Sequence, residues 1–357
     1  MRRVAVAVAL AAGAALLLPS TRPPAAKPPP GRAPATVAWP KADRADIPGN
    51  LPDGPIFTPA LFVDARTAAG TAPSPDARTL RLLIRHGDGT LRELRRLPLD
   101  RNPEFGAVTA HGDDLVWTES AGRGRPRLWT ANLRDRAPAR LLTADTGDAL
   151  FYGSQYDLVV FGGRVYWAAA NGPDTEIRSV ALTGGPVRVR AEPGTWALSG
   201  WPWLVDGADG TGTRTLRNLA TGRDTEVRAG GGELTTCGPL WCRVMVLSTG
   251  HSGGGTGLVR IDLMHPDGSG RRRIAGSAAG AAVTDVAELN RFEILSEARP
   301  NADLTGTEGL LVYDIATGRT VDVSAAASAA FSRGGVLWWS TGDQDTTVWH
   351  TIDLRTV

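Results

Sequence analysis

DLVVFGGRVYWAAANGPDTEIRSVALTGGPVRVR, at residues 157–190, contains four short segments rich in apolar residues, separated by turns rich in Gly, Asn and Asp. Short segments of this kind, with β-branched and aromatic residues and with turn signals at both ends, are typical of β-strands. The stretch therefore predicts one antiparallel sheet of four strands.

The same pattern recurs from about residue 100 onward. Its most recognisable part is an aromatic strand after a Gly- or Asp-containing turn, and the equivalent positions are Trp117, Trp167, Trp203, Trp241, Ile294 and Trp338. These positions are 50, 36, 38, 53 and 44 residues apart. A four-stranded unit repeated every 40 to 45 residues or so is the signature of a β-propeller. Blades stacked around an axis bury both faces of each sheet, and bulky tryptophans suit the gaps between blades.

The number and closure of the blades follow from the repeat. Innermost strands are expected to begin near residues 60, 106, 155, 195, 234, 282 and 327, which predicts seven four-stranded blades, with six as the alternative. The last unit ends at Val357 after three strands. A ring must not leave an open sheet edge, so we expect an N-terminal strand to complete the last blade. Residues 35–39 are the candidate for that strand.

Three segments resemble a known family. Residues 261–274 (IDLMHPDGSGRRRI) and 127–143 (RLWTANLRDRAPARLLT) resemble the strand, turn and basic strand of TolB-like propeller repeats. Residues 72–85 (APSPDARTLRLLIR) resemble the family's Ser-Pro-Asp-Gly turn, with Ala77 at the position of the glycine. The resemblance implies an all-β propeller that acts by binding a partner, and it supports the six-bladed alternative. These motifs set turn geometry and carry no chemistry.

The N-terminus has the features of an export signal. Arg2 and Arg3 precede an apolar run at residues 4–18, which is shorter than the ~20 residues of a usual membrane span. We therefore expect a signal peptide or short N-terminal anchor at residues 1–26 and a Pro-rich linker at 27–50 that could include the closing strand. A single propeller domain would follow at 51–357. The protein would be extracytoplasmic, secreted or associated with the cell envelope, and only its N-terminal segment would touch a membrane.

Charge argues against a nucleic-acid partner. The first 26 residues carry three arginines and no acid, so removing them lowers the formal net charge from +2 to −1. The remainder has no polybasic footprint of the kind that binds phosphate backbones.

The two cysteines, Cys237 and Cys242, rule out a disulfide-dense scaffold and a four-cysteine zinc site. They flank Gly238 and Pro239, at a predicted turn between the first two strands of one blade. Export would place them in an oxidising compartment. The sequence therefore predicts a disulfide between them.

No group of residues in the sequence predicts catalysis. The five histidines do not fall at metal-ligand spacing, and no Gly-x-Ser-x-Gly elbow occurs. No motif selects a pair among the many acids for glycoside hydrolysis. We therefore assign no catalytic residue, and we expect neither a metal nor a cofactor.

Two long loops, at residues 143–157 and 297–308, could shape a binding site if they face the same mouth of the axial channel. Aromatic surface with a few polar groups is the usual composition of a ligand site. The candidates are the aromatic and polar residues of these loops together with two tryptophans near another loop: Tyr152, Gln155, Tyr156, Arg299, Asp303, Trp196 and Trp201.

The leading functional hypothesis is an exported, monomeric, non-enzymatic propeller that binds a protein, peptide or cell-envelope component. The alternative is a propeller enzyme, a hydrolase or lyase acting on glycans or lactones through a channel-mouth site. A third hypothesis is a purely structural module displayed on the Pro-rich stalk.

Overall fold

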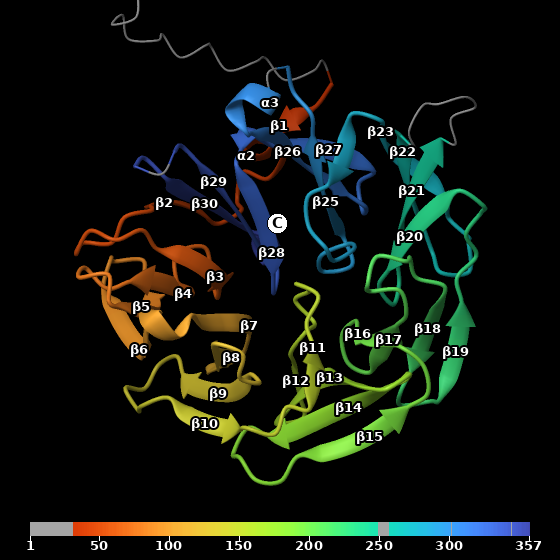
Figure 1. Ribbon diagram of the computed structural model, residues 1–357. Coiled ribbons are helices and arrows are strands. Elements are labelled where there is room, and N and C mark those ends of the chain that lie inside the picture. The colour runs from red at the N-terminus through yellow and green to blue at the C-terminus, as the bar shows by residue number, and fades with distance from the viewer. Residues whose placement is uncertain (1–30, 249–256, 301, 344) are drawn as a thin grey trace, which may run out of the picture. The chain divides into compact units, whose positions relative to one another are not determined.

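The computed structural model describes residues 31–357, except 249–256, 301 and 344. The described strands form seven sheets arranged in a ring, which is a seven-bladed β-propeller (Figure 1). Within each blade consecutive strands pair antiparallel, from the innermost strand outward. The prediction of seven blades is confirmed, and the six-bladed alternative is wrong.

The blades follow one another along the chain. Blade one contains β3 (Thr58–Phe62), β4 (Ala68–Pro73), β5 (Thr79–Arg85) and β6 (Leu91–Pro98), and the 3₁₀ helix η1 (Leu99–Arg101) leads to the next blade. Blade two contains β7 (Pro103–His111), β8 (Asp114–Ala121), β9 (Arg127–Asn132) and β10 (Arg140–Thr143). Blade three contains β11 (Asp148–Leu150), β12 (Val159–Phe161), β13 (Arg164–Asn171), β14 (Asp174–Ala181) and β15 (Arg188–Glu192). Blade four contains β16 (Ala197–Leu198), β17 (Trp203–Val205), β18 (Thr215–Asn218) and β19 (Arg223–Glu226).

The remaining blades complete the ring. Blade five contains β20 (Glu233–Cys237), β21 (Cys242–Ser248), β22 (Gly257–Met264) and β23 (Arg272–Gly276). Blade six contains β24 (Ala279–Ala281), β25 (Phe292–Glu297), β26 (Glu308–Asp314) and β27 (Arg319–Ala327), with the helix α3 (Ala302–Thr305) between β25 and β26. Blade seven contains β28 (Ala329–Arg333), β29 (Val336–Thr341) and β30 (Val348–Asp353), and the 3₁₀ helix η2 (Leu354–Thr356) follows.

An N-terminal strand closes the ring, as expected. β2 (Arg44–Pro48) pairs antiparallel with β30, with Arg44 opposite Ile352 and Pro48 opposite Val348. The assignment of residues 35–39 to this strand is wrong, because Ala35–Ala38 form the helix α2. The helical turn instead buries Ala35 and Trp39 in the core, at 5% and 7% exposure.

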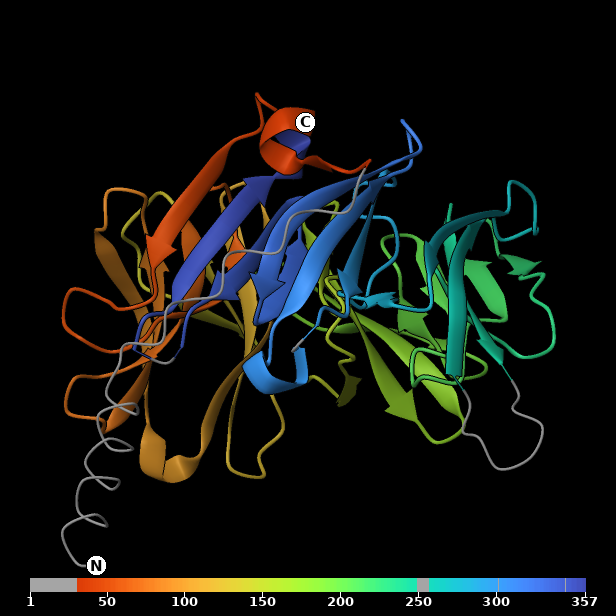
Figure 2. The same cartoon turned by 90° about the horizontal axis from the view of Figure 1, so that it is seen from above.

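The N-terminal segment packs into the fold before it reaches β2. β1 (Ala33–Pro34) adds a parallel strand to the outer edge of β27. The Arg44 guanidinium then holds the α2 turn, since it donates to the carbonyl oxygens of Ala35 and Trp39, each at 2.7 Å. The red helix lies beside the C-terminus in Figure 2, where the Asp43 N–H donates to Thr356 Oγ1 at 2.9 Å. The Pro-rich segment is thus not a spacer over its whole length.

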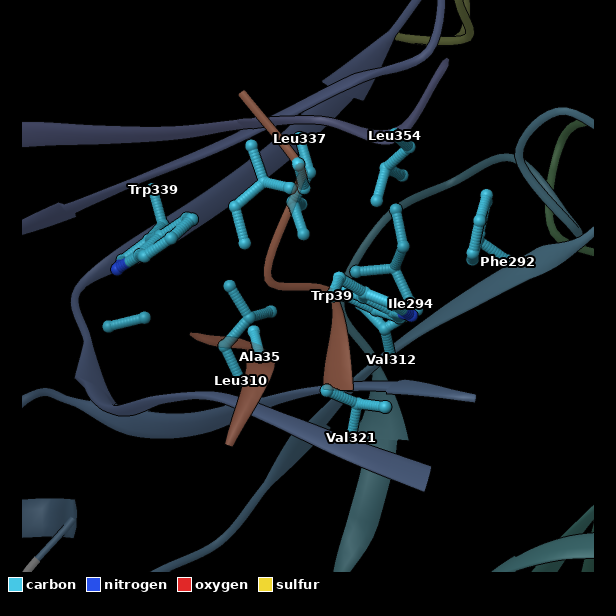
Figure 3. Close-up of a cluster of buried hydrophobic side chains, with 13 residues drawn as sticks. Ala35, Trp39, Phe292, Ile294, Leu310, Val312, Val321, Leu337, Trp339 and Leu354 are labelled. Atoms are coloured by element: carbon cyan, nitrogen blue, oxygen red, sulfur yellow. The ribbon is translucent and has the colours of Figure 1, made fainter. Parts of the chain in front are cut away.

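Apolar side chains fill the gaps between blades. Trp117, Trp167 and Trp338 are 0–1% exposed, which confirms the expected core role for these three, while the repeated Trp203 and Trp241 are partly buried. The cluster between blades six and seven includes Trp39 from the N-terminal segment, whose ring meets Phe292 edge-on with centroids 5.7 Å apart (Figure 3). Burying a large apolar side chain stabilises a fold by roughly 1.5–3 kcal/mol, so this cluster couples the N-terminal segment to the last two blades.

The turn in blade one has an alanine in a backbone conformation that glycine prefers. Ala77 adopts a φ of +52°, the left-handed region that glycine prefers, and its N–H donates to the Ser74 carbonyl at 2.8 Å. The strand pairing beyond the turn therefore imposes a backbone conformation that is strained for alanine.

The innermost strand of blade three is split. Both β11 and β12 pair with β13, with Leu150 opposite Ala168 and Val159 opposite Tyr166. Residues 151–158 therefore stand opposite Trp167 alone. We call residues 151–158 the channel loop. The loop expected at residues 143–157 is thus partly strand, and its remainder interrupts an inner strand instead of linking two blades.

No helix in the described part of the chain is long and apolar enough to cross a membrane. The segment expected to be a signal peptide or anchor, at residues 1–26, lies outside the described residues.

Candidate functional site

A cavity of about 680 Å³ lies beside the channel loop. Its walls come from the channel loop, from the inner strands of blades four to seven, and from the links that follow some of those strands. Wall residues that represent these elements are Tyr152, Tyr156, Leu198, Thr236, Asp285 and Phe331. The cavity thus brings together segments that are far apart in the sequence.

The channel loop is closed by its own carboxylate. Asp157 accepts the backbone N–H groups of Tyr152 and Gly153, at 3.0 and 2.8 Å. Gly153 has a φ of +78°, which lets the chain turn back toward Asp157. The loop therefore has a defined shape before any contact with other blades.

Blade six holds the channel loop from the other side of the ring. Asp285, in the link between β24 and β25, accepts the Ser154 hydroxyl at 2.6 Å and the Gln155 N–H at 2.8 Å. Glu288, in the same link, accepts the Gln155 side-chain amide at 2.8 Å. The Gln155 amide oxygen accepts the Gly334 N–H of blade seven at 3.0 Å.

Arg333, at the end of β28, binds the same loop. Its guanidinium donates to the carbonyl oxygens of Gly153 and Ser154, each at 3.3 Å, and to that of Val108 in blade two at 3.4 Å. Asp157, Asp285 and Glu288 surround it, and each favours the charged guanidinium. The positive charge of Arg333 therefore partly offsets the negative charges of three acids that are mostly buried.

Burial shifts the titration of these acids. It raises the pKa of Asp157 from its usual 3.8 to about 6, although the N–H groups of Tyr152 and Gly153 and the Arg333 charge act in the opposite direction. Burial also raises the pKa of Asp285 and that of Glu288. The Tyr156 hydroxyl has a raised pKa because of burial and the nearby charges of Glu288 and Asp285. Perturbed groups of this kind concentrate at functional sites, and they also occur in structural networks.

A second buried pair supports the cavity wall. The Arg243 guanidinium, 3% exposed, bonds to the carboxylate of Glu293, which is fully buried. Arg243 also donates to the carbonyl oxygens of Val283 and Asp285, at 3.1 and 2.6 Å. The other Glu293 oxygen accepts the Ala287 N–H at 2.7 Å. The link that carries Asp285 and Glu288 is thereby fixed.

The predicted disulfide is present at the cavity wall. Cys237 and Cys242 are bonded and stand directly opposite each other in β20 and β21, with Cα atoms 4.0 Å apart. The Gly238 N–H donates to the Trp241 carbonyl at 2.8 Å and closes the turn between them. Cys237 lines the cavity, so the bridge stiffens one of its sides.

The structure brings only some of the predicted site residues together. Tyr152 and Tyr156 line the cavity, and Gln155 bonds across the ring within the channel loop. Trp201 lies in the turn after β16, outside the lining. It stacks on Phe161 with centroids 6.0 Å apart and contacts Tyr166 in a tilted arrangement with centroids 3.9 Å apart. Trp196 is buried in the core, where its indole N–H donates to the Pro193 carbonyl at 2.7 Å.

The loop at residues 297–308 does not join the cavity. Arg299 pairs with Glu297 and Asp322 in blade six, at 3.4 and 3.6 Å. Asp303 lies in α3, and its side chain is outside the described residues. Described residues of this loop, including Thr307, instead line a cavity of about 490 Å³ that adjoins the first one and shares Ala281, Ala282 and Ala330 with it.

Asp285, Glu288, Arg243 and Arg333 were not among the predicted site residues. The inner strand expected to begin near residue 282 is β24, which ends at Ala281, and residues 284–289 (TDVAEL) belong to the link to β25. The available signal was the placement of two acids in a mostly apolar stretch near the channel. Their partners could not be read from the sequence, since Asp285 is 131 residues from Ser154.

Among the described residues, no group of three or more His, Cys, Asp or Glu side chains could hold a metal ion. Asp285 and Glu288 are instead engaged with the channel loop.

Comparison with known proteins identifies the fold. No family model matches the chain, and no curated protein matches it. A puromycin-hydrolyzing peptidase of Mycobacterium tuberculosis is similar in structure, with 14% identity and a TM-score of 0.53 over 87% of this chain, which spans about half (54%) of that peptidase. An uncharacterized protein of Listeria monocytogenes EGD-e has 9% identity and a TM-score of 0.50, over 84% of this chain and 92% of its own. TolB from Acinetobacter baumannii is also among the matches, with 10% identity and a TM-score of 0.39, over 79% and 63% of the two chains. At these identities the likeness shows the propeller fold alone.

Proposed function

We propose that this chain is an exported, monomeric, non-enzymatic propeller that binds a protein, peptide or cell-envelope component in the channel cavity. One observation carries the proposal: the cavity is large, while the charged groups at its wall are already bonded within the protein. Its volume of about 680 Å³ falls in the range of ~300–1,000 Å³ that is usual for ligand sites.

The hydrogen bonds of the acids favour binding over catalysis. A general acid or base must reach the proton it transfers. Both oxygens of Asp285 accept bonds from the channel loop, and both oxygens of Glu288 accept bonds, from Gln155 and from the Gly335 N–H at 2.9 Å. Arg333 donates to backbone carbonyl oxygens. These groups therefore serve to hold the wall.

Two observations support export. The Cys237–Cys242 disulfide favours an oxidising compartment. The apolar run at residues 4–18 after Arg2 and Arg3 has the form of an export signal.

A cavity-filling variant tests the proposal. Ala281 lines the cavity, and Ala281→Trp would fill part of it. Ala220→Trp, at the exposed turn between β18 and β19, is the matched control. Each purified protein is incubated with isolated cell-envelope material and sedimented, and the supernatant is analysed by mass spectrometry. We expect the unmodified chain and Ala220→Trp to co-sediment and Ala281→Trp to stay in solution.

Two results would refute the proposal. Equal co-sedimentation of Ala281→Trp and Ala220→Trp would place binding outside the cavity. Release of new soluble products that continues with time, and that Ala281→Trp abolishes, would show that the cavity is catalytic.

A further inference from the structure

The polar groups that remain available in the cavity are neutral. Several lining side chains make no hydrogen bond to any described residue, and they carry hydroxyl or amide groups: Tyr152, Tyr156, Ser199, Thr236, Thr284 and Asn290. Each can donate and accept hydrogen bonds. The cavity therefore presents a set of neutral donors and acceptors to whatever enters it.

The charged groups of the wall do not compete for the ligand. Asp285 and Arg333 line the cavity, and the channel loop uses the hydrogen bonds of both. Arg243 is paired with Glu293. A charged ligand would lose water here without gaining an available counter-charge, which is costly. This arrangement favours an uncharged ligand.

An aromatic pair follows Gly200, a residue that touches the cavity wall at Tyr156. Tyr156 packs beside Gly200, and a Cβ atom on Gly200 would lie 3.4 Å from the Tyr156 ring. Trp201 follows in the chain and stacks on Phe161, which is 53% exposed. A chain-like ligand could thus occupy the cavity with one end and cover the Trp201–Phe161 pair with the next units.

The backbone offers little to an extended peptide. Peptides that bind to sheets do so by adding a strand to an exposed edge. Two of the four inner strands beside the cavity are short, since β16 has two residues and β24 has three, while β20 and β28 have five each. A sugar chain needs no such edge, because its rings present apolar C–H faces to aromatic rings and its hydroxyls bond to neutral side chains.

We propose that the cavity binds a neutral oligosaccharide, whose outer units lie on the Trp201–Phe161 pair. The inference rests on the function proposed above, and it names the ligand class of that site. It assigns hydrogen bonding to the Tyr152 and Tyr156 hydroxyls and stacking to the Trp201–Phe161 pair, of which Phe161 is the exposed member.

The test uses calorimetry with cellohexaose, mannohexaose and chitohexaose as neutral probes. Hexagalacturonate is the acidic probe, and a (Gly-Ser)₃ peptide is the peptide probe. Each probe is titrated into the protein to a concentration of about 5 mM, at which even a millimolar dissociation constant gives measurable occupancy of the site. We expect at least one neutral hexasaccharide to bind. Tyr152→Phe and Tyr156→Phe should each lower the affinity for that hexasaccharide by about 3- to 10-fold, the effect of one neutral hydrogen bond. Tyr313→Phe, between blades five and six, is the control and should leave the affinity unchanged.

The exposed aromatic pair gives a second readout. Phe161→Ser should lower the affinity for the hexasaccharide but not for the corresponding disaccharide, because the disaccharide occupies only the cavity and does not reach Phe161. Ala281→Trp should abolish both interactions. Phe161 is half exposed, so this substitution should leave the fold intact.

The proposal is overturned if no neutral hexasaccharide binds, if hexagalacturonate or the peptide binds more tightly, or if both Tyr→Phe variants bind like the unmodified chain. The function proposed above is tested separately by co-sedimentation. Loss of envelope binding in Ala281→Trp without any sugar binding would retain the cavity as the binding site and reject only the ligand class.

Discussion

Asp157 should make the stability of the fold depend on pH. Its pKa rises from 3.8 to about 6 on folding, mainly because of burial. Below pH 3.8 the carboxyl is protonated in both the folded and the unfolded chain. Between these values the folded chain holds a proton that the unfolded chain releases, so the contribution of Asp157 to stability falls as the pH rises. Above pH 6 the Asp157 carboxyl is ionised in both the folded and the unfolded chain, so its contribution to stability no longer falls with pH.

The size of the effect follows from the same shift. A pKa change from 3.8 to about 6 corresponds to about 3 kcal/mol in the free energy of unfolding. Asp157→Asn removes the titration and also one acceptor, because the carboxylate accepts the N–H groups of both Tyr152 and Gly153. The lost acceptor gives an offset that does not vary with pH. The difference in unfolding free energy between the unmodified chain and Asp157→Asn should therefore change by about 3 kcal/mol between pH 3.5 and 7.

Urea unfolding at half-unit pH steps, followed by tryptophan fluorescence, measures this difference. Asp100→Asn, at an exposed position in η1, is the matched control for removing one carboxylate. If the difference between the unmodified chain and Asp157→Asn stays constant from pH 3.5 to 7, burial does not control this acid, and the reasoning is wrong. If the unmodified chain instead gains stability relative to Asp157→Asn as the pH rises, the hydrogen bonds to the carboxylate outweigh its burial.

Four further changes test other parts of the structure. Ala77→Gly should raise the free energy of unfolding by about 1 kcal/mol, because glycine relieves the strain at a φ of +52°, and a lower stability in thermal denaturation would contradict this. Trp39→Ala should cost about 3–5 kcal/mol in urea unfolding, since Trp39 is 7% exposed in the cluster between blades six and seven, and a loss below about 1 kcal/mol would remove the N-terminal segment from the core. Replacing both cysteines by serine should cost about 2 kcal/mol, as expected for so short a covalent loop, and two alkylatable thiols in the unreduced chain would show that the bridge does not form. Arg333→Met should speed amide hydrogen exchange in residues 151–158 and leave exchange in β5 unchanged, and equal protection of the channel loop would show that Arg333 does not hold it.

The sequence could predict what depends on local pattern. Trp117, Trp167 and Trp338 recur at blade spacing because each must fill the same kind of gap, so the repeat predicts both the ring and its core. Cys237 and Cys242 flank one tight turn, so their pairing follows from a single hairpin.

The rest depends on contacts that only the closed ring creates. Arg333 reaches the carbonyl of Gly153 across 180 residues of sequence, and no periodicity marks such a pair. The choice of Arg44–Pro48 over residues 35–39 for the closing strand depends on how Trp39 packs between blades six and seven, which are far from it in sequence. The pair of tyrosines in the channel loop was predicted as part of a ligand site, but the acids and the arginine that position the loop were not.

The closing strand also sets the order in which the fold can be completed. β2 precedes the strands of all seven blades in the sequence, and its partner β30 follows the other described blade strands; Arg44 pairs with Ile352. Contacts so distant in sequence slow folding, because the chain must close a long loop before they can form. Until the C-terminal residues are available, β2 has no partner and part of the hydrophobic cluster around Trp39 stays open. A chain that passes a membrane unfolded, N-terminus first, would therefore finish its ring only after its last strand had emerged, and its early strands would need protection from pairing with other chains.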